Sequence, residues 1–277
     1  MHTRRQFLAT AAVLPMAAAE TPRHIPIGLE MYSVRNEMKA DLMGTVRDVA
    51  KLGYECVEFY APYFEWTADY AREVRAQLDG LGISCFSTHN DSQSFTESGL
   101  KKAIELNHIL GSKYVVMAHP GSVKGLDGWK RVADTLNHSI EPLRAAGMRP
   151  GYHNHDLEFH EIDGKKPMDI IASTEKAVGI QVDTGGCIQG GGDPLELIRK
   201  HPGRIFSLHC KEYSTDPKKG FRVLIGEGGV PWKKILDAAE KTGGVEYYLI
   251  EQEGADLPPL ETVKRCLANF KKIHGDA

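Results

Sequence analysis

From residue 27 onward, short runs of apolar and β-branched residues alternate with longer segments whose apolar residues recur every three or four positions. The short runs are typical of buried strands, and the longer segments have the period of amphipathic helices. The predicted strands are 27–33, 56–60, 83–89, 114–120, 149–155, 179–183, 205–212 and 247–253. The predicted helices are 42–52, 69–81, 100–110, 129–146, 167–173, 194–200, 232–242 and 260–273.

Strict alternation of strand and helix predicts consecutive βαβ units and a parallel sheet. Eight such units are the number that closes a (β/α)8 barrel, the TIM-barrel fold of the α/β class. The competing fold is an open doubly wound sheet, but no G-x-G-x-x-G motif follows the first predicted strand. No linker or low-complexity tract interrupts the pattern, so we predict one domain over residues 20–277.

Polar residues gather at the ends of nearly all the predicted strands. They are Glu30, Glu58, His89, His119, His153, His155, Asp183, His209, Lys211, Glu251 and Glu253. In this fold the active site lies at the C-terminal ends of the strands, so these positions favour a shared site. Side chains two positions apart on a strand point to the same face. His209 therefore shares a face with Lys211, and Glu251 shares one with Glu253, which supports a common site.

Carboxylate and imidazole groups in this arrangement predict a divalent metal site. Asp183, His209 and Glu251 supply three ligands from the sixth, seventh and eighth strands, and the fifth strand supplies a fourth. Mixed oxygen and nitrogen ligands suit Mn2+, Co2+, Zn2+ or Mg2+. Without a metal, carboxylates this close together would repel one another and their pKa values would rise.

Several motifs occur in a characteristic order along the chain. They are Gly28-Leu29-Glu30-Met31-Tyr32-Ser33-Val34-Arg35, His153-Asn154-His155-Asp156-Leu157-Glu158-Phe159, Val182-Asp183-Thr184, His209-Cys210-Lys211-Glu212, Gly226-Glu227-Gly228 and Glu251-Gln252-Glu253. The series resembles the xylose-isomerase-like TIM-barrel superfamily, whose members are often called sugar phosphate isomerases or epimerases. The second motif matches the H-N-H-x-x-E-F signature of one branch. The first resembles G-x-Q-x-Y-S-x-R, with Glu30 where Gln is usual.

The resemblance implies a metal held by an acid on strand five together with Asp183, His209 and Glu251. His153 occupies the position of that acid, so two candidates remain for the fourth ligand, Glu158 just beyond the strand and His153 itself. Glu158 is the favoured one. The resemblance also implies that Glu158 and Glu251 exchange protons with the substrate. His155 is then a proton shuttle or a group that orients a metal ligand.

Other polar residues are expected to bind the sugar rather than react with it. This group comprises Glu30, Glu58, His89, His119, His153 and Glu227. Glu227 can close over the substrate or simply occupy the turn that its flanking glycines permit. Lys211 can stabilise an oxyanion, or can merely pair with Glu212. The glycines at 190–192 are interpreted as a flexible rim loop rather than a phosphate cradle.

These groups predict a metal-dependent sugar isomerase or epimerase. A ketose or keto-sugar would chelate the metal, and removal of the α-proton would give an enediolate. The alternative is a lyase or hydratase acting on a 3-keto-glycoside or keto-inositol, in which the same intermediate expels a β-substituent. A third hypothesis is a sugar-binding barrel without catalysis, which complete retention of Asp183, His209 and Glu251 argues against.

The first nineteen residues differ from the rest of the chain. Arg4 and Arg5 precede a mostly apolar stretch that ends in Ala17-Ala18-Ala19, which is typical of a cleaved export signal. The segment resembles a twin-arginine signal, the alternatives being a Sec signal or a disordered tail. It predicts a bacterial protein in the periplasm or otherwise exported, with no membrane anchor after cleavage, and favours free or oxidised sugars over sugar phosphates.

Composition excludes several other classes. The chain has 277 residues with 34 Lys and Arg against 37 Asp and Glu, a net charge of -3. No basic run is present, which argues against nucleic acid as a partner. The expected partner is a small sugar, and the sequence leaves open a homo-oligomer.

Overall fold

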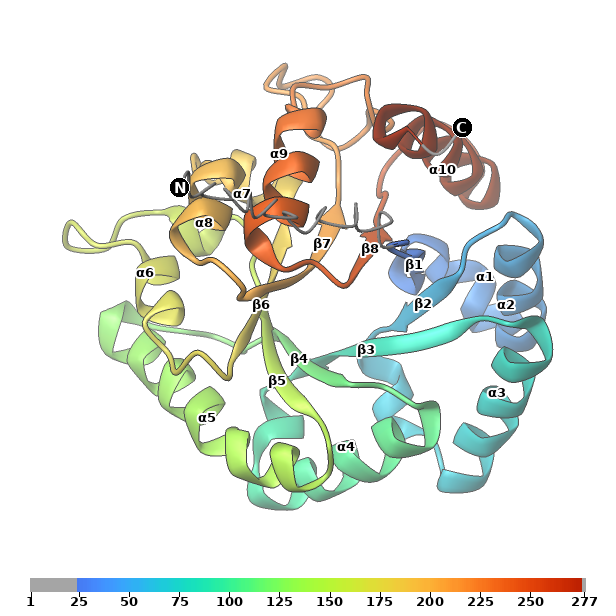
Figure 1. The fold of residues 1–277 in the computed structure, drawn as a ribbon, viewed down its shortest axis with the longest axis horizontal. Coiled ribbons are helices and arrows are strands. Elements are labelled where there is room, and N and C mark those ends of the chain that lie inside the picture. The colour runs from blue at the N-terminus through green and yellow to red at the C-terminus, as the bar shows by residue number, and fades with distance from the viewer. Residues whose placement is uncertain (1–23, 276–277) are drawn as a thin grey trace, which may run out of the picture.

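The computed structural model describes residues 24–275 as a closed parallel barrel of eight strands in the order β1 to β8. Figure 1 shows the strands at the centre and the helices outside them. The strands are β1 (Ile27–Glu30), β2 (Cys56–Phe59), β3 (Ser84–Asp91), β4 (Tyr114–His119), β5 (Arg149–His153), β6 (Gly179–Asp183), β7 (Ile205–Cys210) and β8 (Tyr247–Ile250). The predicted TIM barrel and its single-domain architecture are confirmed.

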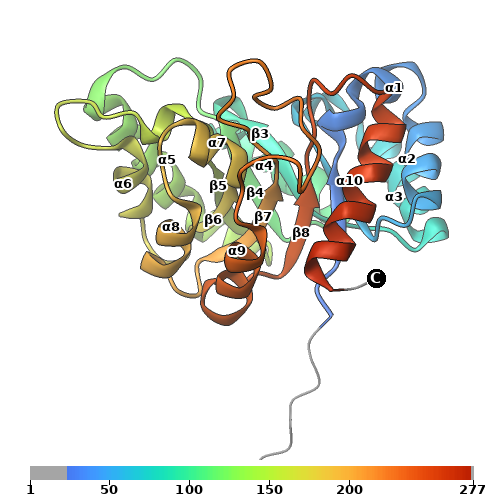
Figure 2. The ribbon, with the colours of Figure 1, turned by 90° about the horizontal axis from the view of Figure 1, so that it is seen from above.

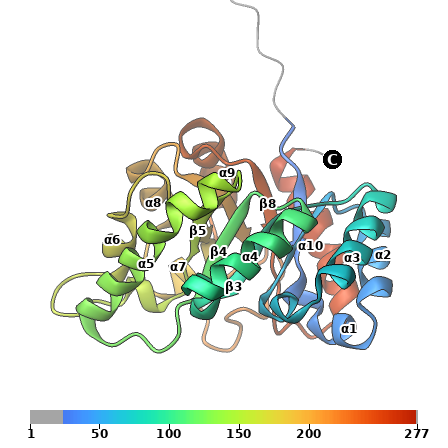
Figure 3. The same ribbon diagram turned by 90° about the horizontal axis from the view of Figure 1, so that it is seen from below.

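The helices form a ring around the barrel, seen from opposite sides in Figures 2 and 3. They are α1 (Arg35–Ala40), α2 (Leu42–Lys51), α3 (Ala68–Leu81), α4 (Glu97–Leu110), α5 (Gly125–Ala145), α6 (Pro167–Ala172), α7 (Thr184–Gln189), α8 (Pro194–Lys200), α9 (Trp232–Ala238) and α10 (Pro259–His274). Glycines in the left-handed region end α3 at Gly82 and α4 at Gly111.

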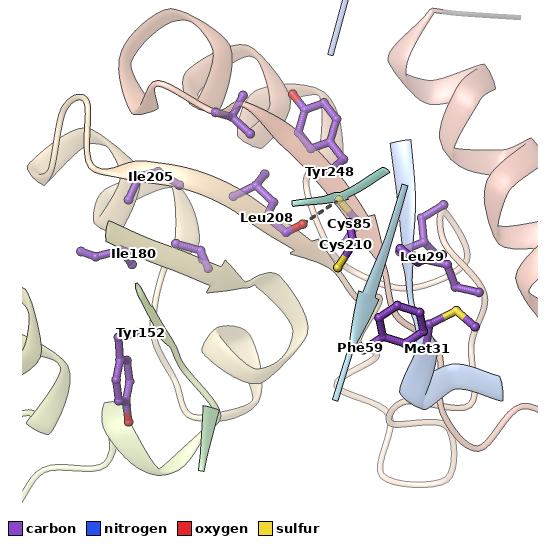
Figure 4. Close-up of a cluster of buried hydrophobic side chains, with 14 of the residues drawn as sticks. Leu29, Met31, Phe59, Cys85, Tyr152, Ile180, Ile205, Leu208, Cys210 and Tyr248 are labelled. Carbon is purple, nitrogen blue, oxygen red and sulfur yellow. Dashed lines mark hydrogen bonds between the residues drawn. The ribbon is translucent and has the colours of Figure 1, made fainter. Parts of the chain in front are cut away.

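Two apolar layers hold the barrel together. The larger one lies between strands and helices and includes Leu29, Leu208 and Tyr248, which Figure 4 shows beside one another. The smaller one fills the interior and consists of Cys56, Tyr114, Val116, Phe206, Tyr247 and Leu249. The interior is therefore a packed core, and the histidines, lysine and carboxylates that line the pocket lie above it.

Phe206 reaches the interior because the register of β6 and β7 shifts between Ile180 and Gln181. Its ring stacks on Tyr114 with centroids 3.9 Å apart. A Cβ atom added at Gly179 would lie 2.5 Å from the Phe206 ring, and one at Gly151 would lie 2.9 Å from it. Glycine at both positions makes room for this ring.

Several strands end earlier than the sequence predicts. Strand β5 ends at His153, β7 at Cys210 and β8 at Ile250. His155, Lys211 and Glu253 therefore lie in the loops that follow, because the chain bends into the barrel mouth as soon as pairing stops. Helices α1 and α7 were not predicted, since both are only six residues long and lack a clear apolar period.

The predicted signal at 1–19 lies outside the described residues. Within residues 24–275, no helix combines the length and apolar character needed to cross a bilayer.

The glycine that makes room for Phe206 gives a stability prediction. Gly179→Ala should lower the free energy of unfolding by about 1–3 kcal/mol through overpacking, measured by urea denaturation. Adding Phe206→Leu should recover part of that loss, because the smaller side chain leaves space for the new methyl group. Strictly additive losses in the double variant would show that the two side chains do not compete.

Candidate active site

A pocket of about 210 Å³ opens at the C-terminal ends of the strands. Its walls carry, among others, His89, His119, His153, His155, Lys211 and Glu251. Most of these side chains come from different strands or the loops after them, as the fold requires of a TIM-barrel site.

Glu58 lies beneath this pocket and is fully buried. Its carboxylate accepts hydrogen bonds from Gln181 Nε2 at 3.1 Å and from Ser87, and it lies 2.7 Å from His209 Nε2 and 3.1 Å from His89 Nε2. Burial alone would raise the pKa of Glu58, but His89 and His209 outweigh it and lower the pKa to about 2. Glu58 is thus a buried anion that orients two histidines rather than part of the pocket wall.

His209 lies between two carboxylates. Its Nδ1 is 2.8 Å from Glu251 Oε2, and its Nε2 is 2.7 Å from Glu58 Oε2. Burial alone would lower the pKa of His209, but these two hydrogen bonds outweigh it and raise the pKa to about 9. Without a metal, these contacts favour the protonated ring, whose positive charge offsets both carboxylates.

Gln181 is a site residue that the sequence analysis missed. Its Oε1 lies 2.7 Å from His89 Nε2 and 3.1 Å from His153 Nδ1, while its Nε2 donates to Glu58. An amide oxygen only accepts, so His153 carries its proton on Nδ1 and presents a lone pair on Nε2. The sequence could have indicated this residue, because Gln181 lies two positions before Asp183 on β6 and so points to the same face. It was missed because an amide side chain is neither an acid or base nor a usual metal ligand.

The residues that best fit a metal are His153, Asp183 and Glu251. Each offers one ligand atom, and these atoms lie within 4.8 Å of one another. All three side chains are buried, and His209 adjoins them through Glu251. Lone pairs of one imidazole and two carboxylates suit a divalent cation of borderline or hard character.

Lys211 supplies positive charge to the same carboxylates. Its Nζ lies 2.8 Å from Glu251 Oε1, 2.6 Å from Glu253 Oε1 and 3.8 Å from Asp183 Oδ2. Burial alone would lower the pKa of Lys211, but these carboxylates raise it, so the ammonium keeps its charge. Lys211 does not pair with Glu212, whose carboxylate accepts from Gly226 N, Val230 N and Trp232 Nε1 in the following loop.

Glu158 lies apart from the other candidate ligands. Its carboxylate accepts from Tyr152 OH at 2.5 Å and from the backbone N–H of His155 at 2.9 Å, and its side chain is buried. The structure therefore brings His153, rather than Glu158, to Asp183 and Glu251. The sequence motif could not distinguish them, because the short loop after β5 decides where Glu158 points.

The expected sugar-binding residues occupy different places. Glu30, His89, His119 and His153 line the pocket. Neither carboxylate oxygen of Glu30 has a hydrogen-bond partner among the described residues, and burial raises its pKa well above the usual value. Glu227 is exposed and accepts from Leu224 N within its own turn, so it does not reach the pocket.

A family model described as the xylose isomerase-like TIM barrel matches residues 46–273. The chain belongs to this family. The predicted resemblance is confirmed in this respect. The match begins within α2 and ends one residue before the end of α10, so β1 and α1 lie outside it.

The relatives of this family member include named enzymes. An inosose dehydratase from Lacticaseibacillus casei is 25% identical over 198 residues, which are 60% of this chain and 66% of that protein. The match thus spans just under two thirds of the relative. Among the curated relatives, the name inosose dehydratase recurs in several bacteria.

Solved structures agree on the fold. A sugar phosphate isomerase/epimerase from Parabacteroides distasonis superimposes with a TM-score of 0.75 at 23% identity, covering 93% of this chain and 96% of that one. A D-psicose 3-epimerase superimposes with a TM-score of 0.68 at 13% identity, covering 91% of this chain and all of that one. At these identities the likeness establishes the barrel and no more.

The two candidates for the strand-five ligand can be separated by measuring bound metal. In this xylose isomerase-like barrel, His153→Ala should weaken binding of Mn2+ or Co2+ by at least about tenfold, because a lone pair is lost from the cluster. Glu158→Gln is the matched control and should keep its metal. Calorimetric titration of metal-stripped protein gives the affinities. Loss of metal in Glu158→Gln alone would assign the ligand to Glu158 instead.

Proposed function

We propose that this protein is a divalent-metal-dependent lyase that removes a β-substituent from a keto-sugar or keto-inositol. The observation that carries the proposal is that unlike groups face the same pocket: the imidazole of His155, the ammonium of Lys211 and the carboxylate of Glu251. Several curated relatives are named inosose dehydratase, and these names support the same reaction class.

Epimerisation needs a different arrangement of proton-carrying groups from the one that elimination needs. An epimerase removes a proton from one face of the substrate carbon and returns one to the other, so it requires two proton carriers on opposite sides. The pair expected for this role was Glu158 and Glu251. Glu158 is held by Tyr152 and the His155 backbone, outside the pocket wall, so one member of that pair does not face the substrate.

We assign the metal to His153, Asp183, His209 and Glu251, which requires His209 to give up the Nδ1 proton that it shares with Glu251. A divalent cation bound there supplies positive charge beside the substrate carbonyl and makes the neighbouring C–H bond more acidic. Gln181 and Glu58 keep the ligand rings of His153 and His209 in fixed orientations.

His155 acts as the proton carrier. Its ring lies in the pocket wall, 4.9 Å from the His153 ring and 5.2 Å from the His119 ring, measured between centroids. The imidazole removes the proton from the carbon next to the carbonyl, the electron pair forms a C=C bond, and the β C–O bond breaks. The same proton then passes from His155 to the departing oxygen, so water or an alcohol leaves. Lys211 stays protonated and donates to the oxygen that becomes negative.

The reaction class can be tested with a keto-inositol and with methyl 3-keto-glucoside in deuterated water. The metal-loaded protein should release water or methanol and form a conjugated enone, followed by its ultraviolet absorption. His155→Ala should lower kcat by about 10²–10⁴-fold, because the proton carrier is lost. His160→Ala, an exposed position in the same segment, is the control. Deuterium exchange at the α-carbon without release of either product would instead indicate an isomerase or epimerase.

We also propose that the chain is exported through its twin-arginine segment. Replacing Arg4 and Arg5 by lysine should keep the protein in the cytoplasm, because the receptor reads the arginine pair rather than the charge. Cell fractionation followed by immunoblotting measures the result. Unchanged export of this variant would favour a different route.

A further inference from the structure

A second, larger hollow adjoins the pocket on the side of β1 and β2. It has a volume of about 770 Å³ and is lined by α1, the start of α2 and the segment 59–70. Figure 2 shows α1, α2 and α3 together at one end of the molecule. Tyr60 lines both this groove and the pocket, so the two spaces share a wall residue.

One wall of the groove is a rigid aromatic cluster. The Trp66 ring meets Phe59 edge to face with centroids 5.1 Å apart, and meets Tyr70 in the same way at 5.4 Å. Behind them Tyr63 is buried, and its hydroxyl lies 2.6 Å from Asn90 Oδ1 and 2.8 Å from Asn107 Nδ2. Because these rings are already fixed, a bound ring would cost little ordering of the wall.

The opposite rim carries positive charge. The Arg35 guanidinium donates to the backbone oxygen of Tyr32 at 2.9 Å and lies 4.3 Å from the centre of the Tyr32 ring. Lys39 also lines the groove. The lining therefore contains two cationic side chains, Arg35 and Lys39, and one carboxylate, that of Asp41. Aromatic faces together with an excess of cations suit a ring that bears oxygen and gains negative charge.

We propose that the groove binds an aromatic group attached to the keto-sugar, and that this group leaves in the elimination. This rests on the proposed function, because the sugar must occupy the neighbouring pocket. The pocket of about 210 Å³ suits a single sugar ring, so a larger substrate must extend beyond it. The groove at Tyr60 is more than three times as large and has the matching chemistry.

The substrate class is then an aryl glycoside oxidised to a ketone two carbons from the anomeric centre. His155 removes the proton from the carbon between the ketone and the anomeric carbon. The bond from the anomeric carbon to the phenolic oxygen breaks, the oxygen keeps the electron pair, and it receives the same proton. The products are a phenol in the groove and an unsaturated keto-sugar in the pocket, with no oxidant or reductant consumed.

The test compares phenyl and methyl 3-keto-glucosides with the metal-loaded protein. The ratio of kcat/KM for the phenyl over the methyl substrate should fall about three- to tenfold in Trp66→Ala, the range expected for one lost ring contact. Tyr70→Ala is a second variant for the case in which the first fails to fold. Leu81→Ala, on α3 but outside the groove, should leave the ratio unchanged. An unchanged ratio in the folded groove variants would overturn the proposal while the lyase activity stands.

Binding without turnover separates the two proposals further. Saturation-transfer NMR should detect phenol on the unaltered protein, with a signal that falls sharply in Trp66→Ala. Failure of both substrates to react, with phenol binding lost in the variant, would overturn the lyase proposal and keep the aromatic site. Phenol binding of equal strength in all variants would remove the aromatic site.

Discussion

The carboxylates of Glu30, Glu58, Asp183 and Glu251 lie close together at the mouth of the barrel and are almost completely buried, so their negative charge must be compensated there. Unpaired charges at such depth are costly, so each carboxylate either has a cationic neighbour or takes up a proton. His209 forms hydrogen bonds with Glu58 and Glu251, and Lys211 forms ion pairs with Glu251 and Asp183. Glu30 accepts no hydrogen bond within the described residues and lies 4.0 Å from His89 Nδ1, and burial raises its pKa well above the usual value.

This requirement arranges the interior in layers. Tyr114, Phe206 and Tyr247 fill the lower barrel with packed rings. Glu58 and Gln181 come next, and they fix the orientation of three histidines through hydrogen bonds. Above that layer, His153, Asp183 and Glu251 offer ligand atoms that lie within 4.8 Å of one another. The chemistry at the mouth therefore depends on a polar layer that the pocket itself does not expose.

Residues on regular strands were predictable, and residues in loops were not. Alternation along β6 and β7 was enough to place Asp183 and His209 on the inner face, because a strand permits only two directions. The loop after β5 follows no such rule, so the direction of Glu158 depended on hydrogen bonds to Tyr152 and to the His155 backbone. The register shift between β6 and β7 that turns Phe206 inward was also unpredictable, because no sequence motif marks the position of this irregularity in strand pairing.

The substitution of an acid by His153 at the end of β5 changes the charge of the site. With Glu158, Asp183 and Glu251 as ligands, a divalent ion would leave one net negative charge, which opposes any further anion. With neutral His153 in place of the acid, the same ion would balance Asp183 and Glu251, and part of the Lys211 charge would remain available. A neutral metal shell beside an ammonium would stabilise an oxygen that becomes negative in the proposed reaction. The departure at His153 therefore favours chemistry in which negative charge accumulates on the substrate, as it does when a proton is removed beside a carbonyl.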